Sequence, residues 1–386
     1  MRILLGMCFV IIFSGCKVQE KVSLLDNNSF VKIINNVNVF TGQKYIENTN
    51  LVFNDSIIVA ISENVASYKN FQTIDGKGKT IIPPLANAHV HLWYPDSLRS
   101  SLSTGIFANF DMHNTDHGSN YIRSSSNSAQ HAKFYSSNAA ATVPGGHGTQ
   151  FGIPVPTIND TISPERFVQD RLKAGADYIK VIKEPKFNTL TDEQTLRVIN
   201  EAHKNELLAV GHSHKIQETI VLVDQNIDGI VHIWFDKQAD KMQLEKMKKG
   251  EVFLVPTMLV TKKVLNMGKS QGWSGLVLNF EEVLMEIKKA HDAGIKILCG
   301  TDAPNFGLNY TDSLFDEMDL LAQAGLPNLE VLKSATVNIY TSFQLDDFDE
   351  LKSSTKANFL IIEGNPVNNL KDLRNSKKVY RNGSEI

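Results

Sequence analysis

The chain has 386 residues, of which 42% are hydrophobic and 21% charged, and this balance is typical of a soluble globular protein with a large core. It excludes a disordered chain, a collagen-like repeat and a polytopic membrane protein. The length predicts two or three domains, or one large barrel. The net charge of −3 provides no basic field, so we expect no nucleic-acid partner.

The first 15 residues resemble the signal peptide of a bacterial lipoprotein. Arg2 precedes the apolar residues 3–13, a run too short for a membrane span of about 20 residues. The run ends in Phe13-Ser14-Gly15-Cys16, and in such proteins cleavage before the cysteine is followed by lipidation of its thiol. We therefore expect Cys16 to anchor the exported protein to a bacterial membrane, periplasmic or at the cell surface, through a polar tether at 16–29.

An ordinary secretory signal cleaved nearby is the alternative, and it keeps the export but loses the anchor. The cysteine count agrees with either interpretation. Cys8 leaves with the signal and Cys16 carries the lipid, so Cys299 stays alone and no internal disulfide is predicted.

Short β segments flank a longer middle region. They are rich in β-branched residues and are separated by turn residues, and they lie at 31–34, 51–53, 57–61, 71–74, 357–362 and 378–380. We expect residues 30–82 and 351–386 to join into one small composite β-sandwich.

Residues 83–350 alternate between short apolar strands and helical patterns. The strands are predicted at 177–182, 207–210, 229–233, 252–255 and 295–299. Ser163 followed by Pro164 and Glu165 predicts one helix start, and Thr191 with Gln194 forms a capping box for another. A third helix is predicted over 280–293, ending at Gly294.

Such alternation over roughly 255 residues predicts a parallel sheet, and the length suits a closed (β/α)₈ barrel of the TIM type. A doubly wound open sheet is the alternative fold. No G-x-G-x-x-G follows any strand, so the nucleotide-binding version of that fold has no support.

Two His-x-His pairs are the most informative feature of the sequence. With 11 histidines in 386 residues, chance gives about 0.3 such pairs, and two are present. His89 and His91 follow the apolar segment 80–82. His212, the first histidine of the pair His212 and His214, ends the strand at 207–210. Residues i and i+2 of a strand point the same way, so both imidazoles of a pair can reach one cation.

Other candidate ligands also lie in or after strands. His232 is in the strand at 229–233, Lys180 in the strand at 177–182, and Asp302 in the turn after 295–299. In a barrel the carboxyl ends of the strands converge on one mouth, where active sites form. A lysine in an apolar strand is costly unless it is paired or modified.

With these residues in place, the sequence is similar to the amidohydrolase superfamily, near its imidazolonepropionase-like and Xaa-Pro dipeptidase branches. The similarity covers about residues 30–386. Five motifs carry it: PPLANAHVHL at 83–92, GADYIK at 175–180, GTDAP at 300–304, ATVN at 335–338 and ANFLIIEGNP at 357–366.

The resemblance implies a binuclear site for divalent metal, with zinc favoured. His89, His91 and Asp302 would bind the buried ion, and His212 and His232 the exposed one. Lys180, carboxylated by CO₂, would bridge the two ions as a carbamate. Asp302 would also be the catalytic acid and base, which takes a proton from the bridging water and returns it to the leaving nitrogen.

Two further histidines are implied to contact the substrate, His147 in TVPGGHG (142–148) and His214. His113, His117, His131, His203 and His291 have no such context, so we expect them to be surface or packing residues. The family usually has an acid before the strand-six histidine, whereas Val231 precedes His232 here. Lys183 is expected to be solvated or to pair with an acid.

The sequence thus predicts an exported, metal-dependent amidohydrolase that cleaves a C–N bond of a dipeptide, an N-acyl amino acid or a cyclic amide. A mononuclear enzyme, a lactone or phosphotriester hydrolase, and an anchored binding protein are the alternatives. The expected partner is a small molecule, with membrane contact only through the lipid anchor, and a homo-oligomer is left open.

Overall fold

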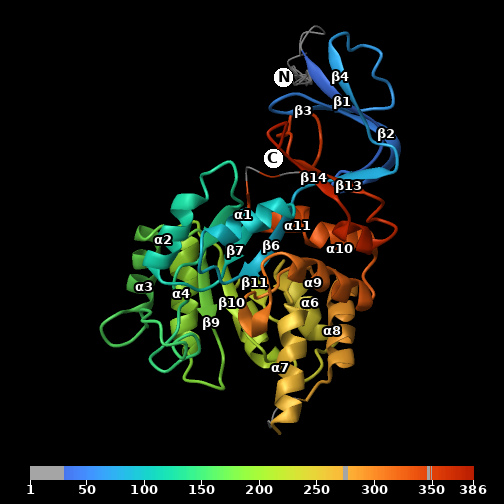
Figure 1. The fold of residues 1–386 in the computed structure, drawn as a ribbon. Helices are drawn as coiled ribbons and strands as arrows, with labels where there is room; N and C mark the ends of the chain where they lie inside the picture. Colours follow the sequence, from blue (N-terminus) through green and yellow to red (C-terminus); the bar gives the residue numbers. More distant parts are fainter. Residues whose placement is uncertain (1–29, 273–276, 346–347, 349) are drawn as a thin grey trace, which may run out of the picture.

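The computed structural model describes residues 30–272, 277–345, 348 and 350–386. The predicted signal peptide (1–15), the lipidation site Cys16 and the tether lie outside the described residues. A sheet made from both ends of the described chain lies at one end of the molecule, and a larger body of helices and strands lies below it (Figure 1). Within the described residues, no helix is both long and apolar enough to span a bilayer.

The sheet has eight strands in the order β15-β14-β13-β5-β1-β2-β3, with β4 paired to β1. Their bounds are β1 (Val31–Phe40), β2 (Tyr45–Phe53), β3 (Ile58–Ile61), β4 (Phe71–Asp75), β5 (Lys79–Ile82), β13 (Phe359–Glu363), β14 (Lys377–Arg381) and β15 (Ser384–Glu385). The N- and C-terminal segments meet where β5 and β13 pair antiparallel, with Ile81 opposite Ile361. The predicted β segments are therefore strands of one composite sheet, while its division into a two-layer sandwich stays a prediction.

The two faces of this sheet pack differently because neighbouring residues of a strand point to opposite sides. Leu360 and Ile362 belong to the hydrophobic cluster of the larger body. Phe359 faces the other way, where its ring lies 5.1 Å from that of Phe53 and 4.8 Å from that of Tyr380. The sheet thus has a core of its own and is also packed onto the body.

The body contains seven further strands: β6 (Leu85–Val90), β7 (Ile106–Asp111), β8 (Lys133–Ser136), β9 (Ile179–Ile182), β10 (Ala209–His212), β11 (Gly229–Val231) and β12 (Phe253–Val255). Its helices are α1 (Asp96–Ser103), α2 (Asp116–Ser125), α3 (Pro164–Lys173), α4 (Asp192–Lys204), α5 (Ile216–Asp224), α6 (Lys241–Lys249), α7 (Met258–Ser270), α8 (Phe280–Asp292), α9 (Asp312–Gln323), α10 (Asn328–Ser334) and α11 (Val337–Ser342), with short 3₁₀ turns η1 (Asn305–Gly307) and, ahead of β14, η2 (Leu370–Arg374).

These strands form two parallel sheets, β6-β7-β8 and β9-β10-β11-β12. Isolated parallel bridges add Ala141 to Val181, Leu254 to Ile297 and Val90 to Ala303. Parallel strands alternating with covering helices are consistent with a TIM-barrel-like domain.

The predicted strand at 295–299 is wrong as a regular strand, because only a bridge at Ile297 is formed. The backbone there hydrogen-bonds to both sides without a continuous ladder: Leu298 N–H donates to Leu254 O, and Ala88 N–H donates to Cys299 O. The predicted link between 80–82 and the first histidine pair also needs correction. Pro83-Pro84 ends β5, and His89 lies in the separate strand β6, with His91 directly after its end.

Local capping signals predicted the helix starts well. Ser163 Oγ accepts the N–H of Arg166 at the start of α3, and Thr191 and Gln194 form the predicted capping box of α4. α8 ends at Asp292, just before Gly294, whose φ is +81°. Each signal acts within one turn of the chain, so no tertiary information is needed to read it.

Helix α7 is capped from a distant element. Thr257, which precedes it, gives no side-chain cap. Instead, the buried Glu317 carboxylate of α9 accepts the N–H of Met258 at 2.7 Å and that of Leu259 at 2.9 Å. Burial raises the pKa of Glu317 to about 8.

This burial predicts a pH-dependent stability. The pKa of Glu317 is higher in the folded protein than in the unfolded chain, so the folded state binds more protons between these two values. The contribution of Glu317 to the free energy of unfolding is therefore fully present below pH 4.5 and is lost as pH rises through about 8. Over that window the free energy of unfolding of the wild type should fall relative to Glu317→Gln by about 1 kcal/mol per pH unit. Urea unfolding of both proteins at pH 6, 7 and 8 measures this difference, and parallel stability curves would contradict it.

Candidate active site

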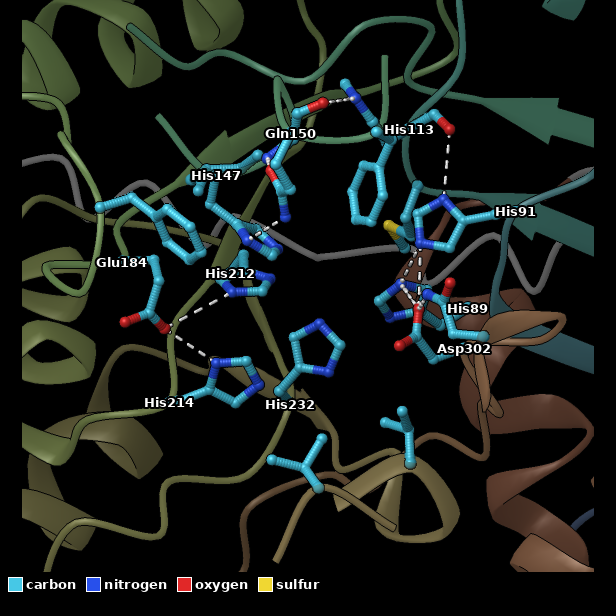
Figure 2. Close-up of a pocket in the computed structure, with 18 of the residues that line it drawn as sticks. His89, His91, His113, His147, Gln150, Glu184, His212, His214, His232 and Asp302 are labelled. Carbon is cyan, nitrogen blue, oxygen red and sulfur yellow. Dashed lines mark hydrogen bonds and ion pairs between the residues drawn. The ribbon is translucent and has the colours of Figure 1, made fainter. Parts of the chain in front are cut away.

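A cavity of about 1100 Å³ opens in the body at the carboxyl ends of its strands. All eight predicted metal- and substrate-contacting residues line it: His89, His91, His147, Lys180, His212, His214, His232 and Asp302. They come from segments up to 213 residues apart in the chain, and Figure 2 shows the side chains of all but Lys180 pointing into one space. The structure therefore brings together every predicted site residue that it describes.

His89, His91 and Asp302 form the tightest group. Asp302 Oδ1 lies 3.1 Å from His89 Nε2 and 3.0 Å from His91 Nε2, and the two Nε2 atoms are 3.4 Å apart. Asn87, where the family usually has Asp, joins strand β6 to the turn that holds Asp302. Its Oδ1 accepts the N–H of Thr301, and its Nδ2 donates to the Thr301 hydroxyl.

His212, His214 and His232 form a second group, and one ring nitrogen of each lies within 4.8 Å of the others. His232 also belongs to a group with His89 and Asp302. Figure 2 accordingly shows His232 between the two sets of side chains, and its ring centroid is 4.9 Å from that of His89 and 4.5 Å from that of His212.

Most of these imidazoles are oriented through Nδ1. His91 Nδ1 lies 3.2 Å from the carbonyl oxygen of His113, His214 Nδ1 lies 2.8 Å from Glu184 Oε2, and His232 Nδ1 lies 2.7 Å from Thr257 Oγ1. A hydrogen bond from Nδ1–H leaves the Nε2 lone pair free for a metal ion. Position 231 is a valine and offers no acid to His232, and the hydroxyl of Thr257 is the hydrogen-bond partner of His232 instead.

Lys180 lines the cavity and is buried, with 3% of its surface exposed. Among the described residues, no hydrogen bond or ion pair is found for its Nζ. Burial lowers the pKa of Lys180 to about 7, although Asp302 and Asp111 act in the opposite direction. A substantial fraction of the amine is therefore neutral near pH 7, which is the form that reacts with CO₂.

Burial also keeps most of the histidines neutral. It lowers the pKa of His89 to about 3 and of His147 to about 4, and it lowers the pKa of His212 and of His232 well below the usual value. His91 differs: burial would lower its pKa, but the hydrogen bond to Asp302 and the charges of Asp302 and Asp111 together outweigh burial and raise the pKa. Neutral imidazole is the form that binds a metal ion, so protons compete little for these nitrogens at pH 7.

Two ligand candidates have left-handed backbone conformations. His232 has a φ of +70° and Asp302 a φ of +62°, and Thr257, the partner of His232, has a φ of +47°. Such conformations are uncommon for residues other than glycine, and they concentrate at functional sites. The backbone thus accepts strain where it aims these side chains at the cavity.

The donor set fits a divalent transition metal. Ligand atoms at the usual zinc distances from one ion are about 3.3 Å apart at the edges of a tetrahedron. The separations of 3.0, 3.1 and 3.4 Å among His89, His91 and Asp302 match this value. His212 Nε2 is buried without a hydrogen-bond partner, 3.8 Å from Glu184 Oε2, which leaves its lone pair available.

Four residues at or beside the site escaped the sequence prediction: Glu184, His113, Gln150 and Thr257. His113, expected to be a surface or packing residue, is half-buried beside His91 and Gly148 and also lines the cavity. The rule that strand ends face the mouth could have found Glu184 and Thr257, which follow β9 and β12. Lys183 is confirmed as a pairing residue, with its Nζ 2.6 Å from Asp192.

This arrangement combines parallel strands, covering helices and a histidine-rich mouth whose side chains could hold a metal ion. The chain matches the amidohydrolase family over residues 80–386 and belongs to it. It is therefore a hydrolase of carbon–nitrogen bonds. No curated protein matches the sequence.

Solved structures with the same fold share little sequence with this chain. A Xaa-Pro dipeptidase with bound methionine has a TM-score of 0.77 at 18% identity, covering 92% of this chain and 99% of its own. A prolidase complexed with N-methylphosphonate-L-proline has a TM-score of 0.75 at 17% identity, covering 92% and 99%. The ochratoxinase of A. niger has a TM-score of 0.78 at 19% identity, covering 93% and 96%.

Proposed function

We propose that this protein is a metal-dependent amidohydrolase that cleaves the C–N bond of a small amide, namely a dipeptide, an N-acyl amino acid or a cyclic amide. The observation that carries the proposal is the convergence of His89, His91, His212, His232, Lys180 and Asp302 on one cavity. Two structural relatives are named with bound ligands of this size class: methionine in a Xaa-Pro dipeptidase and N-methylphosphonate-L-proline in a prolidase.

His89, His91 and Asp302 would hold a buried ion, and His212 and His232 an exposed one. When bound, such ions supply a nucleophilic water at neutral pH and polarise the carbonyl group. Lys180 lines the same cavity as both histidine groups, and a carbamate on its Nζ would supply an anion to it. The amine of Lys180 is buried and its pKa is lowered to about 7, and both properties support this modification.

Asp302 would move the proton. The hydrogen bonds and charges of His89 and His91 outweigh its burial and hold the pKa of Asp302 well below its usual range, so it starts as a carboxylate. It accepts the proton of the attacking water as the new C–O bond forms. It then donates that proton to the nitrogen as the C–N bond breaks, which yields a carboxylic acid and an amine.

His147 and His214 would contact the substrate around the scissile bond. The ring of His147 lies 4.6 Å from that of His212, and the ring of His214 lies 4.8 Å from that of His232. Both therefore flank the metal-ligand candidates on the cavity side. His214 also belongs to the group of three histidines that could hold an ion.

Glu184 is expected to tune the exposed ion through these histidines. Burial would raise the pKa of Glu184, but His212 and His214 outweigh it and keep the group a carboxylate. We expect Glu184→Gln to weaken binding of one zinc equivalent by about 10- to 100-fold, because the outer carboxylate orients the imidazoles. Titration against a competing chelator measures this affinity.

The matched control is Glu218→Gln. Glu218 approaches only Lys183, at 4.0 Å, and does not line the cavity. Equal zinc affinities for both variants and the wild type would remove Glu184 from the metal site.

A single-ion enzyme is the second candidate, because His232 groups with His89 and Asp302 as well as with His212. Metal analysis at saturating zinc separates the two cases. Two equivalents with a modified Lys180 support the binuclear centre, and one equivalent with unmodified lysine supports the single-ion form.

The experiment that tests the function is an assay of the metal-analysed protein on dipeptides, N-acyl amino acids and cyclic amides. We expect hydrolysis that a chelator abolishes and zinc restores. Turnover only of lactones or phosphotriesters would change the substrate class, and binding without turnover would favour a binding protein. Failure to retain any divalent metal would overturn the proposal.

We further propose a closed eight-stranded barrel over 83–350 and a composite sandwich from 30–82 and 351–386. The bridges from Ala141 to β9, from β12 to Ile297 and from β6 to Ala303 support the closure. The sequence of residues 1–16 supports export and a lipid anchor at Cys16. Labelling with palmitate and fractionation of cells would test the anchor.

A further inference from the structure

The cavity is much larger than the metal-ligand cluster needs. Its volume of about 1100 Å³ reaches the upper end of the range for small-molecule pockets. The histidines, Lys180 and Asp302 occupy one part of its lining, and apolar side chains dominate the rest.

One wall of this cavity is an apolar stripe on helix α7. Val260, Val264 and Met267 all line the cavity, and their spacing of four and three residues places them on one face of the helix. From the first to the last, the stripe is about 10 Å long at 1.5 Å per residue, comparable with an extended acyl chain of about eight carbons.

Aromatic side chains complete the apolar part. Phe187 and Phe151 lie against His147, with ring centroids 5.2 and 6.2 Å away, and Phe235 lies 5.0 Å from His214. Phe151 is 56% exposed, so an apolar ligand would remove unfavourable surface from water. The apolar part thus adjoins both candidate substrate-contacting histidines.

The cavity is poorly built for the ammonium group of a dipeptide. Its acidic lining residues other than Asp302 already have partners, since Glu184 accepts from His214, and Asp236 accepts the N–H of Ile216. Two exposed lysines, Lys186 and Lys215, also line it and favour a carboxylate instead.

We infer that the substrate is an N-acyl amino acid with a medium-length apolar acyl chain. The chain would lie along the stripe of α7, and the free carboxylate would lie toward the lysines. This inference rests on the proposed amide hydrolysis and specifies its substrate class.

The first test compares N-acetyl-, N-butanoyl- and N-octanoyl-leucine with Xaa-Pro dipeptides as substrates. We expect kcat/KM to rise about fourfold per added methylene until the stripe is covered, because each buried methylene contributes the usual hydrophobic free energy. N-octanoyl-leucine should exceed both the acetyl compound and the dipeptides. Rates within threefold for the acetyl and octanoyl compounds, or a preference for dipeptides, would overturn the inference.

The second test removes the stripe. Val264→Ser with Met267→Ser should lower kcat/KM for N-octanoyl-leucine by about tenfold or more while changing that for N-acetyl-leucine less than twofold. Lys263→Ser, at an exposed position of the same helix, is the control and should change neither. Zinc content and the melting temperature check folding, and Val264→Thr replaces the double variant if it does not fold.

A binding measurement separates this inference from the proposed function. Calorimetric titration of metal-depleted protein should give a much lower Kd for N-octanoyl-leucine than for N-acetyl-leucine. Tighter octanoyl binding with no hydrolysis of any amide would refute the proposed function and keep the apolar subsite. Amide hydrolysis with no effect of chain length on either binding or rate would refute the subsite alone.

Discussion

Replacing Lys180 with alanine is expected to lower kcat by about 10³-fold or more and to reduce bound zinc from two equivalents to one at most. Lys180 is buried and lines the cavity with the other ligand candidates, and its removal deletes the anion that would lie between two cations. Steady-state kinetics and metal analysis measure both effects. In the wild type, a carbamate carbon should also be visible by NMR after incubation with ¹³C-bicarbonate.

Lys183→Met is the matched control for the removal of a buried lysine. Lys183 pairs with Asp192 and donates to the carbonyl of Leu190, so its loss should lower stability and leave zinc content unchanged. Short carboxylates such as propionate should partly restore Lys180→Ala by occupying the vacated space. Full activity of Lys180→Ala without added carboxylate would refute the bridging role.

Asp302→Asn is expected to lower kcat by about 10³-fold, within the range for loss of a general acid–base group. The variant keeps the shape of the side chain but cannot accept a proton at the oxygen that faces His89 and His91. Kinetics at saturating zinc separate this loss from weaker metal binding. The loss should persist at every zinc concentration.

Asp236→Asn is the control, because Asp236 lines the same cavity but accepts a backbone N–H at the start of α5. We expect its kcat to stay within about fivefold of the wild type, as for a residue outside the proton transfer. If Asp302→Asn kept more than a tenth of wild-type activity, another group would have to move the proton.

Much of the fold and of the placement of the ligand candidates could be predicted because the signals are local. Ser163 and Thr191 cap their helices within one turn, and the prediction needed only neighbouring residues. Lys180 and His212 lie in short apolar strands, and the convergence of strand ends turns their positions in the chain into a common place in space.

The outer contacts of the site depend on residues that meet only after folding. Glu184 reaches His214 across 30 positions, Glu317 caps α7 from α9, and Thr257 takes the role of the acid missing beside His232. No local pattern encodes these pairs, because they follow from how neighbouring strands and helices are placed against one another.

The sequence by itself therefore determined which side chains could bind metal and where the helices begin. Only the tertiary structure decided that residues 295–299 form a bridge rather than a strand, that His113 lines the cavity, and that an apolar wall adjoins the ligand candidates. The physical reason is range: capping and strand alternation act over a few residues, whereas cavity shape and hydrogen-bond partners depend on the packing of distant segments.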